Sequence, residues 1–425
     1  MTQSATQNGS NNKDYVFSIT IIGILFFIFG FVTWLNGTLI PFLKISCELN
    51  NFQAYFVTFA FYIAYFVMAA PSSIVLHKVG FKNGMALGLF VMALGSLLFI
   101  PAALTRTFYL FLAGLFIQGT GLAILQTASN PYVVILGPRE SAAKRIAIMG
   151  ICNKIAGAVS PLILGAIVLN QHTKDVVEQL KVAVGSVRLD LLASLAHKVI
   201  LPYIIIAVVL VLLSITLRLI HLPEVDTDDE ADSISSDGTK KTAWYQFPHL
   251  VLGFITLFLY VGVEVMAGDT IILYGLSQHF TLDVARTFTT FTLISMIVGY
   301  IIGIICIPKY ITQDKALAVS AVLGVLFAIA AILTSGYVSV AFIALLGLAN
   351  ALMWPAIWPL ALADLGKFTK AGSALLIMGI AGGALIPLGY GRLVDVIGNQ
   401  SAYWIMVPIY LFIFYYAVAG SKIRR

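Results

Sequence analysis

The chain has 425 residues, of which 60% are hydrophobic and 10% carry a formal charge, and its mean hydropathy is +0.97. Soluble domains carry about 25% charged residues, so this composition excludes an ordinary soluble enzyme. The net charge of +6 does not indicate a nucleic-acid partner, because the basic residues lie between apolar runs. Cys47, Cys152 and Cys306 lie far apart, without disulfide or metal-ligand spacing. We therefore expect no metal and no cofactor.

Twelve apolar segments are long enough to cross a membrane as helices, which requires about 20 residues each. Six lie in the first half, near 16–40, 54–75, 85–104, 108–134, 146–169 and 201–220. Six more lie near 249–277, 287–307, 315–335, 338–360, 371–391 and 402–420. No small-residue cleavage pattern closes the first segment, so we expect it to be retained.

A polar, acidic stretch separates the two sets of six segments. Residues 222–246 combine Asp and Glu with Ser, Gly and Thr, a composition that cannot bury a core and predicts a flexible linker. The predicted organisation is a tail (1–15), a six-helix bundle (16–221), the linker, a second bundle (247–421) and a tail (422–425). This all-α polytopic layout is typical of monomeric secondary transporters that work by alternating access.

Loop charge predicts the orientation in the membrane. With the N-terminus inside, twelve basic residues lie in cytoplasmic segments: Lys78, Lys82, Arg139, Lys144, Arg145, Lys309, Lys315, Lys367, Lys370, Lys422, Arg424 and Arg425. Four lie in short outer loops: Lys44, Arg106, Arg286 and Arg392. This bias predicts a lipid-embedded protein of the bacterial inner membrane with both termini and the linker in the cytoplasm. The outer segment 170–200 mixes both signs, which predicts a small surface helix.

Polar residues inside apolar spans indicate a cavity, because such groups are costly in lipid. The first span contains Trp34 and Asn36, and the fourth contains Gln126 and Asn130. Gln126 and Asn130 are four residues apart and share a helix face. Amides both donate and accept hydrogen bonds, which suits sugar hydroxyls. Amides that bond neighbouring helices remain the structural alternative.

Ionisable residues occur in the fifth and seventh spans. Asn153 and Lys154 lie in an apolar run, and an ammonium there must pair, titrate or touch water. Glu264 and Asp269 follow in the seventh span, with Asp269 nearer its outer end. Intramembrane carboxylates are typical carriers of proton or sodium coupling. A purely structural pair between Glu264 and Lys154 is the alternative.

The tenth span carries Asn350, Trp354 and Trp358 at spacings of four, which places them along one helix face. Trp rings can cover the C–H face of a pyranose while amides bind its hydroxyls. Trp358 has an alternative role as an interfacial anchor, since Trp is common where the membrane meets water.

Four tracts carry a family resemblance: FFIFGFVTWLNGTLIPFLK (26–44), LQTASNPYVVILG (125–137), FLYVGVEVMAGD (258–269) and MWPAIWPLALADLGKFTKAGSALLIMGIAGGALIPLGYG (353–391). They resemble the fucose–proton symporter and glucose/galactose transporter family of the major facilitator superfamily. The resemblance implies two six-helix bundles, a monosaccharide site at midplane between them, and an ion-coupled or facilitated cycle.

The chain departs from the fucose-symporter pattern at two acidic positions. Gly37 stands where that symporter has an aspartate, and Gln126 stands where it has a glutamate. Gln at the second position is usual in glucose/galactose members, so the resemblance implies glucose, galactose or their N-acetylamino derivatives rather than fucose. The pair Asn153 and Lys154 resembles members grouped as N-acetylglucosamine permeases.

Three hypotheses follow. The first is a hexose importer coupled to H⁺ or Na⁺, with Glu264 as the coupling carboxylate. The second is an uncoupled facilitator for a hexose, fucose or another monosaccharide, in which Lys154 neutralises Glu264. The third, a membrane enzyme or sensor, would need a soluble domain, a metal cluster or an activated nucleophile, and the sequence shows none of these. The six histidines lie at span ends or in loops, where we expect solvated or interfacial positions.

Overall fold

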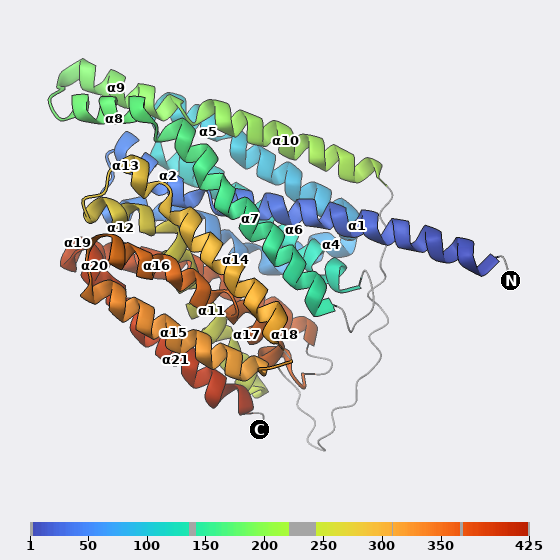
Figure 1. The fold of residues 1–425 in the computed structure, drawn as a ribbon. Coiled ribbons are helices and arrows are strands. Elements are labelled where there is room, and N and C mark those ends of the chain that lie inside the picture. Colours follow the sequence, from blue (N-terminus) through green and yellow to red (C-terminus); the bar gives the residue numbers. More distant parts are fainter. Residues whose placement is uncertain (1–2, 136–141, 221–243, 308, 366–368, 424–425) are drawn as a thin grey trace.

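The structure, a computed structural model, describes residues 3–135, 142–220, 244–307, 309–365 and 369–423 (Figure 1). Within these residues the regular structure is helical, and twelve segments are long and apolar enough to cross a membrane. The prediction of an all-α polytopic fold with twelve spans is therefore confirmed. Most of the predicted linker, 222–246, lies outside the described residues, and its boundaries stay a prediction.

In the described part of the first half, ten α-helices form six spans. They are α1 (Gln3–Thr33), α2 (Asn36–Ser46), α3 (Asn51–Ala54), α4 (Phe56–Leu97), α5 (Phe99–Thr105), α6 (Phe108–Ile135), α7 (Ala142–Val168), α8 (Gln171–Leu180), α9 (Gly185–His197) and α10 (Ile200–Leu219). The long element α4 holds two spans, because Gly80 reverses the chain with a φ of +77°. A positive φ is accessible to glycine without steric cost.

The second half forms six further spans from shorter pieces. Its α-helices are α11 (Pro248–Asp269), α12 (Ile271–Ser277), α13 (Leu282–Ala285), α14 (Phe288–Cys306), α15 (Gln313–Leu333), α16 (Gly336–Asn350), α17 (Met353–Leu362), α18 (Thr369–Met378), α19 (Gly382–Ile397), α20 (Asn399–Ala402) and α21 (Met406–Val418). Its 3₁₀ turns are η2 (Trp244–Gln246), η4 (Gly379–Ala381), η5 (Tyr403–Ile405) and η6 (Gly420–Lys422). Interrupted spans are tolerated where they line a cavity or are buried in protein.

Two sequence expectations change in the structure, and one further feature, the helical start of the chain, was not predicted. The N-terminal tail is helical from Gln3, and α1 projects beyond the bundle (Figure 1). Segment 170–200 holds two helices, α8 and α9, rather than one. His249 is fully buried, so the expectation of a solvated or interfacial histidine is wrong there. Its Nε2 lies 2.8 Å from the carbonyl oxygen of Ala363, a hydrogen bond that offsets the cost of burying the ring nitrogen.

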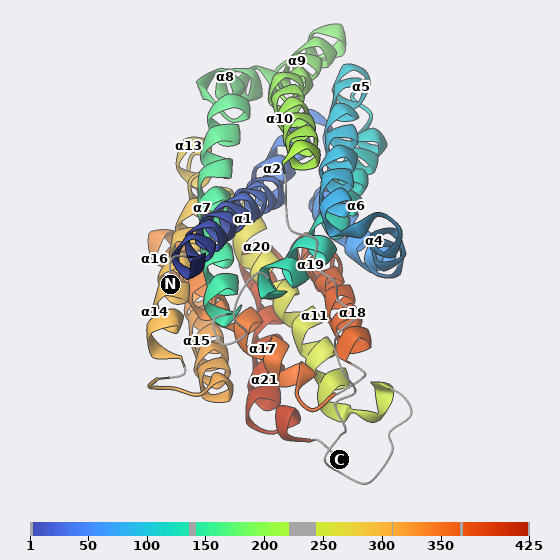
Figure 2. The same cartoon turned by 90° about the vertical axis from the view of Figure 1, so that its right-hand side faces the viewer.

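The helices form two bundles that lie one above the other in Figure 2. In the first half α4 packs on α6 and α10, and α1 packs on α7. In the second half α15 packs on α16 and α21, and α11 packs on α19. The halves meet where α7 contacts α14 and where α4 contacts α19. The predicted two-bundle architecture is confirmed, and any site between the bundles must lie along these contacts.

Glycines permit the closest helix crossings within each half. A β-carbon added at Gly30 of α1 would lie 1.8 Å from the carbonyl oxygen of Asn153 in α7. One added at Gly382, where α19 begins, would lie 1.7 Å from the carbonyl oxygen of Phe258 in α11. Small residues let helix backbones approach in membranes. Gly30 therefore positions α7, which carries two candidate site residues, against α1.

Gly30→Ala should lower the thermal midpoint of the detergent-purified protein, because the added methyl group forces α1 away from α7. Overpacking of this kind costs about 1–3 kcal/mol. Gly389→Ala is the matched control, since Gly389 lies within α19 and a β-carbon there meets no atom within 4 Å. Equal midpoints for both variants in a thermal-shift assay would show that the α1–α7 crossing is not tightly packed.

Candidate functional site

An ion pair joins the two halves of the molecule. Lys154 of α7 donates to Oε1 of Glu264 in α11 across 2.7 Å, and both side chains are nearly buried, with exposures of 9% and 11%. Sequence reasoning left this pairing open as an alternative. An intramembrane lysine and glutamate thus satisfy each other, and either one alone would be an unpaired buried charge.

Trp34 lies directly beside this ion pair. The Lys154 ammonium is 4.6 Å from the centre of the Trp34 ring, which is close enough for a cation–π interaction. The ring fits between two glycines, because added β-carbons at Gly157 and Gly268 would lie 2.3 Å and 2.1 Å from its carbon atoms. Gly157 belongs to the first half and Gly268 to the second. Trp34 therefore contacts both bundles at the junction between α1 and α2.

The predicted amides of the first half take different positions. Asn153 donates weakly to the carbonyl oxygen of Phe26, 3.4 Å away, and so links α7 to α1. Asn36 is buried at the start of α2. Gln126 and Asn130 are half-buried one turn apart on α6, and no hydrogen bond of the described residues joins them to Lys154 or Glu264. Among these candidates of the first half, the structure shows direct contact between Trp34 and Lys154.

The tenth-span residues lie on the other bundle. The Tyr410 hydroxyl donates to Oδ1 of the buried Asn350 across 2.9 Å. Trp354 packs 6.5 Å from Tyr260 and stacks on Trp358 at 5.5 Å with an interplanar angle of 24°. The helix breaks after Asn350, between α16 and α17, and so separates the amide from the two rings.

Three site donors are buried without a hydrogen-bond partner among the described residues: Trp34 Nε1, Asn36 Nδ2 and Asn350 Nδ2. Such orphan donors are uncommon in a folded protein and call for an explanation at each position. Hydroxyl oxygens of a polar ligand would satisfy them. All three belong to residues that the sequence pattern selected as candidates.

Tyrosines around Glu264 were missed by sequence reasoning. Glu264 lies near the hydroxyls of Tyr62, Tyr260, Tyr300 and Tyr410, which come from both halves. In an apolar run a tyrosine of a binding site cannot be distinguished by sequence from a tyrosine of the packed core. Phenol groups can both donate and accept, and here they form a polar surrounding for the carboxylate.

A second carboxylate, Asp269, lies fully buried where α2 meets α11 and α14. Both of its oxygens lack a hydrogen-bond partner among the described residues, although Thr58 and the Gly37 amide face them. A β-carbon added at Gly37 would lie 3.5 Å from Asp269 Oδ1. Thr289 donates to the neighbouring Gly268 carbonyl across 2.8 Å. Asp269 is the last residue of α11 and is fully buried between the halves.

The halves are held together at the end of the bundle opposite the chain termini, which we call the distal end. Asp395 of α19 accepts from Asn51 Nδ2 at 2.8 Å and from the Phe52 amide at 3.0 Å. Arg286 donates to the carbonyl oxygens of Gly165 and Leu169 at 3.1 and 3.0 Å. Both contacts join a charged side chain of the second half to backbone or amide groups of the first half, so the distal end is closed.

A family model described as the Major Facilitator Superfamily matches residues 22–387. The chain belongs to this superfamily. Its members are transporters, which confirms the prediction that the chain is not an enzyme. The twelve spans and the superfamily match together show a multi-pass membrane protein.

Related superfamily proteins match along nearly the whole chain. The glucose/galactose transporter of Brucella abortus biovar 1 (strain 9-941) is 36% identical over 420 residues, covering 97% of this chain and 96% of that protein. The L-fucose-proton symporter of Escherichia coli (strain K12) is 28% identical and covers 93% and 91%. The crystal structure of the superfamily transporter FucP in the outward conformation aligns with a TM-score of 0.71 at 28% identity, covering 95% and 98%. The resemblance inferred from the four tracts is confirmed.

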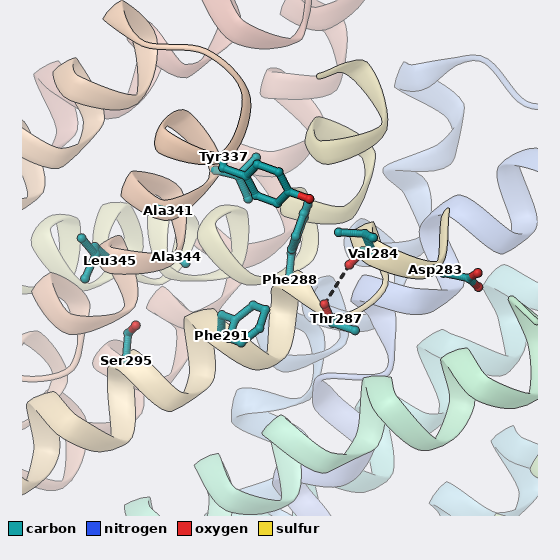
Figure 3. Close-up of a pocket in the computed structure, with 11 residues that line it drawn as sticks. Asp283, Val284, Thr287, Phe288, Phe291, Ser295, Tyr337, Ala341, Ala344 and Leu345 are labelled. Carbon is teal, nitrogen blue, oxygen red and sulfur yellow. Dashed lines mark hydrogen bonds between the residues drawn. The ribbon is translucent and has the colours of Figure 1, made fainter. Parts of the chain in front are cut away.

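A surface pocket of the second half does not coincide with this site. Figure 3 shows a mainly apolar pocket between α14 and α16, near the distal end. Phe291 and Tyr337 in its lining are 52% and 69% exposed, as expected for side chains that face lipid. The charged and amide candidates lie elsewhere. Among the described residues no three His, Cys, Asp or Glu side chains are grouped to hold a metal ion.

Proposed function

We propose that the protein imports a hexose-type sugar, glucose, galactose or an N-acetylhexosamine, by alternating access coupled to H⁺ or Na⁺. The observation that carries this proposal is the Lys154–Glu264 bridge between the halves, beside a tryptophan that contacts both. The unpartnered donors of Trp34, Asn36 and Asn350 fit hydroxyl oxygens. A full-length relative named as a glucose/galactose transporter supports the substrate class.

In this mechanism the sugar competes for groups that otherwise hold the halves together. A sugar hydroxyl can accept from the Lys154 ammonium and donate to the Glu264 carboxylate, while the Trp34 ring covers a C–H face. Gln126, Asn130, Asn153 and Trp354 would complete the site as α6, α7 and α17 move. A ligand shifts such an equilibrium by its differential affinity for the two states, so the sugar must bind one state better.

The proposal also includes the membrane, the orientation of the protein in it and the residues that bind the coupling ion. Loop charge favours the bacterial inner membrane with both termini in the cytoplasm, so that the closed distal end faces outward. The protein would work as a lipid-embedded monomer. Glu264 and Asp269 are the proposed coupling carboxylates, since both lie within the seventh span at the boundary between the halves.

An uncoupled facilitator for a hexose, fucose or another monosaccharide is the second candidate. Two observations favour it: Lys154 already neutralises Glu264, and Gly37 and Gln126 replace the acids of the fucose-symporter pattern. In that case the sugar would equilibrate across the membrane without accumulating.

Uptake into proteoliposomes tests the proposal. Radiolabelled glucose, galactose, fucose and N-acetylglucosamine are each offered with an imposed proton gradient, a sodium gradient or neither. Accumulation of one hexose above equilibrium under one gradient is the expected result. Equilibration that ignores both gradients would support the facilitator, and the absence of counterflow for every sugar would refute sugar transport.

A further inference from the structure

Asp269 is a buried charge that the ion pair of the site leaves unexplained. Glu264 has Lys154 as its counter-charge at 2.7 Å. Asp269 is 0% exposed, and among the described residues neither of its oxygens makes a hydrogen bond or an ion pair. A carboxylate without a partner is costly to bury, whereas a neutral carboxyl group is much less so. While the distal end is closed, Asp269 is therefore more stable with a bound cation or proton than as a bare carboxylate.

Two hydrogen-bond donors face Asp269, and one of them, the Thr58 hydroxyl, can also accept. Gly37 is the second residue of α2, a position where the backbone N–H has no acceptor within its own helix. That amide and the Thr58 hydroxyl of α4 face the carboxylate. The Gly268 carbonyl already accepts from Thr289. A metal cation needs a shell of several oxygen ligands, so this surrounding suits a proton better than Na⁺.

The other titratable groups near Asp269 do not exchange a proton at cellular pH. Tyr62 of α4 and Tyr55, directly before α4, are the ionisable side chains that face it. On α2 the nearest residue is Gly37, and α14 contributes Thr289. Tyrosine gains a charge on losing its proton near pH 10, far above the working range of a cell. Asp269 is thus the group of this cluster that can exchange a proton in use.

The position of Asp269 links its proton to the movement of the halves. Asp269 belongs to α11, while Gly37 and Thr58 belong to the first half. Opening the distal end would withdraw α2 from α11 and admit water to the carboxylate. The Trp34 ring packs against Gly268, next to Asp269, and against the Lys154 ammonium. Trp34, a member of the proposed sugar site, therefore links that site to the carboxylate.

We propose that Asp269 carries the coupling proton of the transport cycle, an inference that rests on the proposed function and specifies its ion. With the distal end open, a proton from solution binds a carboxylate oxygen, and the carboxylate charge of −1 becomes 0. The neutral carboxyl group permits α2 to close over it. After the opposite end opens, the O–H bond ionises and the proton leaves to that side.

The test measures sugar-driven proton movement and counterflow in the same proteoliposomes. One pH unit of gradient supports about tenfold accumulation at one proton per sugar, since tenfold corresponds to about 1.4 kcal/mol. The wild type should accumulate sugar and should alkalinise the medium when sugar is added. Asp269→Asn should lose both, with an accumulation ratio near one, while counterflow stays measurable. Asp314→Asn, at the start of α15 in the same half, is the matched control and should resemble the wild type.

Relocating the carboxylate tests position as well as charge. A β-carbon added at Gly37 would lie 3.1 Å from Thr289 Oγ1 and 3.5 Å from Asp269 Oδ1, so Gly37→Asp combined with Asp269→Ala places a carboxylate in the same region. This double variant should recover at least a tenth of the sugar-driven alkalinisation that Asp269→Ala loses. A role limited to packing would not be rescued in this way, and a double variant that performs counterflow without moving protons would refute the placement.

The remaining outcomes separate the two proposals. Alkalinisation by Asp269→Asn within twofold of wild type, or wild-type accumulation driven by Na⁺ alone, would overturn the proton assignment and leave sugar transport intact. Loss of counterflow in the wild type for all four sugars would overturn sugar transport itself, and the proton assignment with it.

Discussion

Lys154→Ala should reduce sugar counterflow about 100-fold, because it leaves Glu264 as an unpaired charge in a nearly dry site. Breaking one partner of a buried ion pair costs about 3–5 kcal/mol. Glu264→Gln should have a comparable effect, because it leaves the Lys154 ammonium as the unpaired charge. The double variant Lys154→Ala with Glu264→Ala should transport better than either single variant, since it leaves no lone charge between the halves. Initial rates of counterflow in proteoliposomes measure these differences.

An exposed lysine–glutamate ion pair with the same N–O distance provides the control. Lys181 and Glu178 are also 2.7 Å apart, but their side chains are 64% and 67% exposed. Exposed pairs contribute about 0–1 kcal/mol, so Lys181→Ala should leave counterflow unchanged. If Lys154→Ala transported within threefold of wild type, the ion pair could not be a working contact between the halves.

Trp34→Ala should nearly abolish transport, because it empties the space between Gly157 and Gly268 and removes a donor from the proposed sugar site. Truncating a buried tryptophan costs about 3–5 kcal/mol. Trp34→Phe keeps an aromatic face but removes the indole N–H, and one hydrogen bond contributes about 0.5–1.5 kcal/mol. That variant should raise the half-saturating sugar concentration about fivefold to tenfold, with a smaller change in maximal rate.

Trp404 serves as the comparison, since it is 47% exposed on the second bundle. Trp404→Ala should change neither the half-saturating concentration nor the rate by more than about twofold, because surface substitutions have small effects. Size-exclusion profiles of each purified variant separate misfolding from altered binding. A correctly folded Trp34→Phe with wild-type sugar affinity would remove the indole N–H from the site.

Much of the fold follows from local patterns. The twelve spans could be predicted because hydrocarbon demands long apolar segments, and that demand acts on each segment independently of its neighbours. The break of the first span at Trp34 and Leu35 and the two helices in 170–200 were not predicted. Both depend on contacts with other parts of the chain, for example Arg188 of α9, which donates to Glu48 Oε1 from 140 residues away.

The candidate site was predictable in its residue types and less so in its arrangement. Lys154 and Glu264 stood out because each is an ionisable group in an apolar run. The tyrosines around Glu264 did not stand out, because a tyrosine is equally at home in a packed core. Gln126 and Asn130 share a helix face, as their spacing predicts, yet no hydrogen bond within the described residues joins them to the ion pair.

The sequence by itself determined that this protein is embedded in a membrane, how many times it crosses the membrane, and which polar side chains must face something other than lipid. The reason is that the cost of placing a polar group in hydrocarbon depends on that group and its own segment. Tertiary structure alone decided which of those groups meet. Lys154 and Glu264 are 110 residues apart in the chain, and Asp269 lies beside Gly37 from the other half. Such distances are set by how two bundles pack, and bundle packing sums many weak contacts that no single segment encodes.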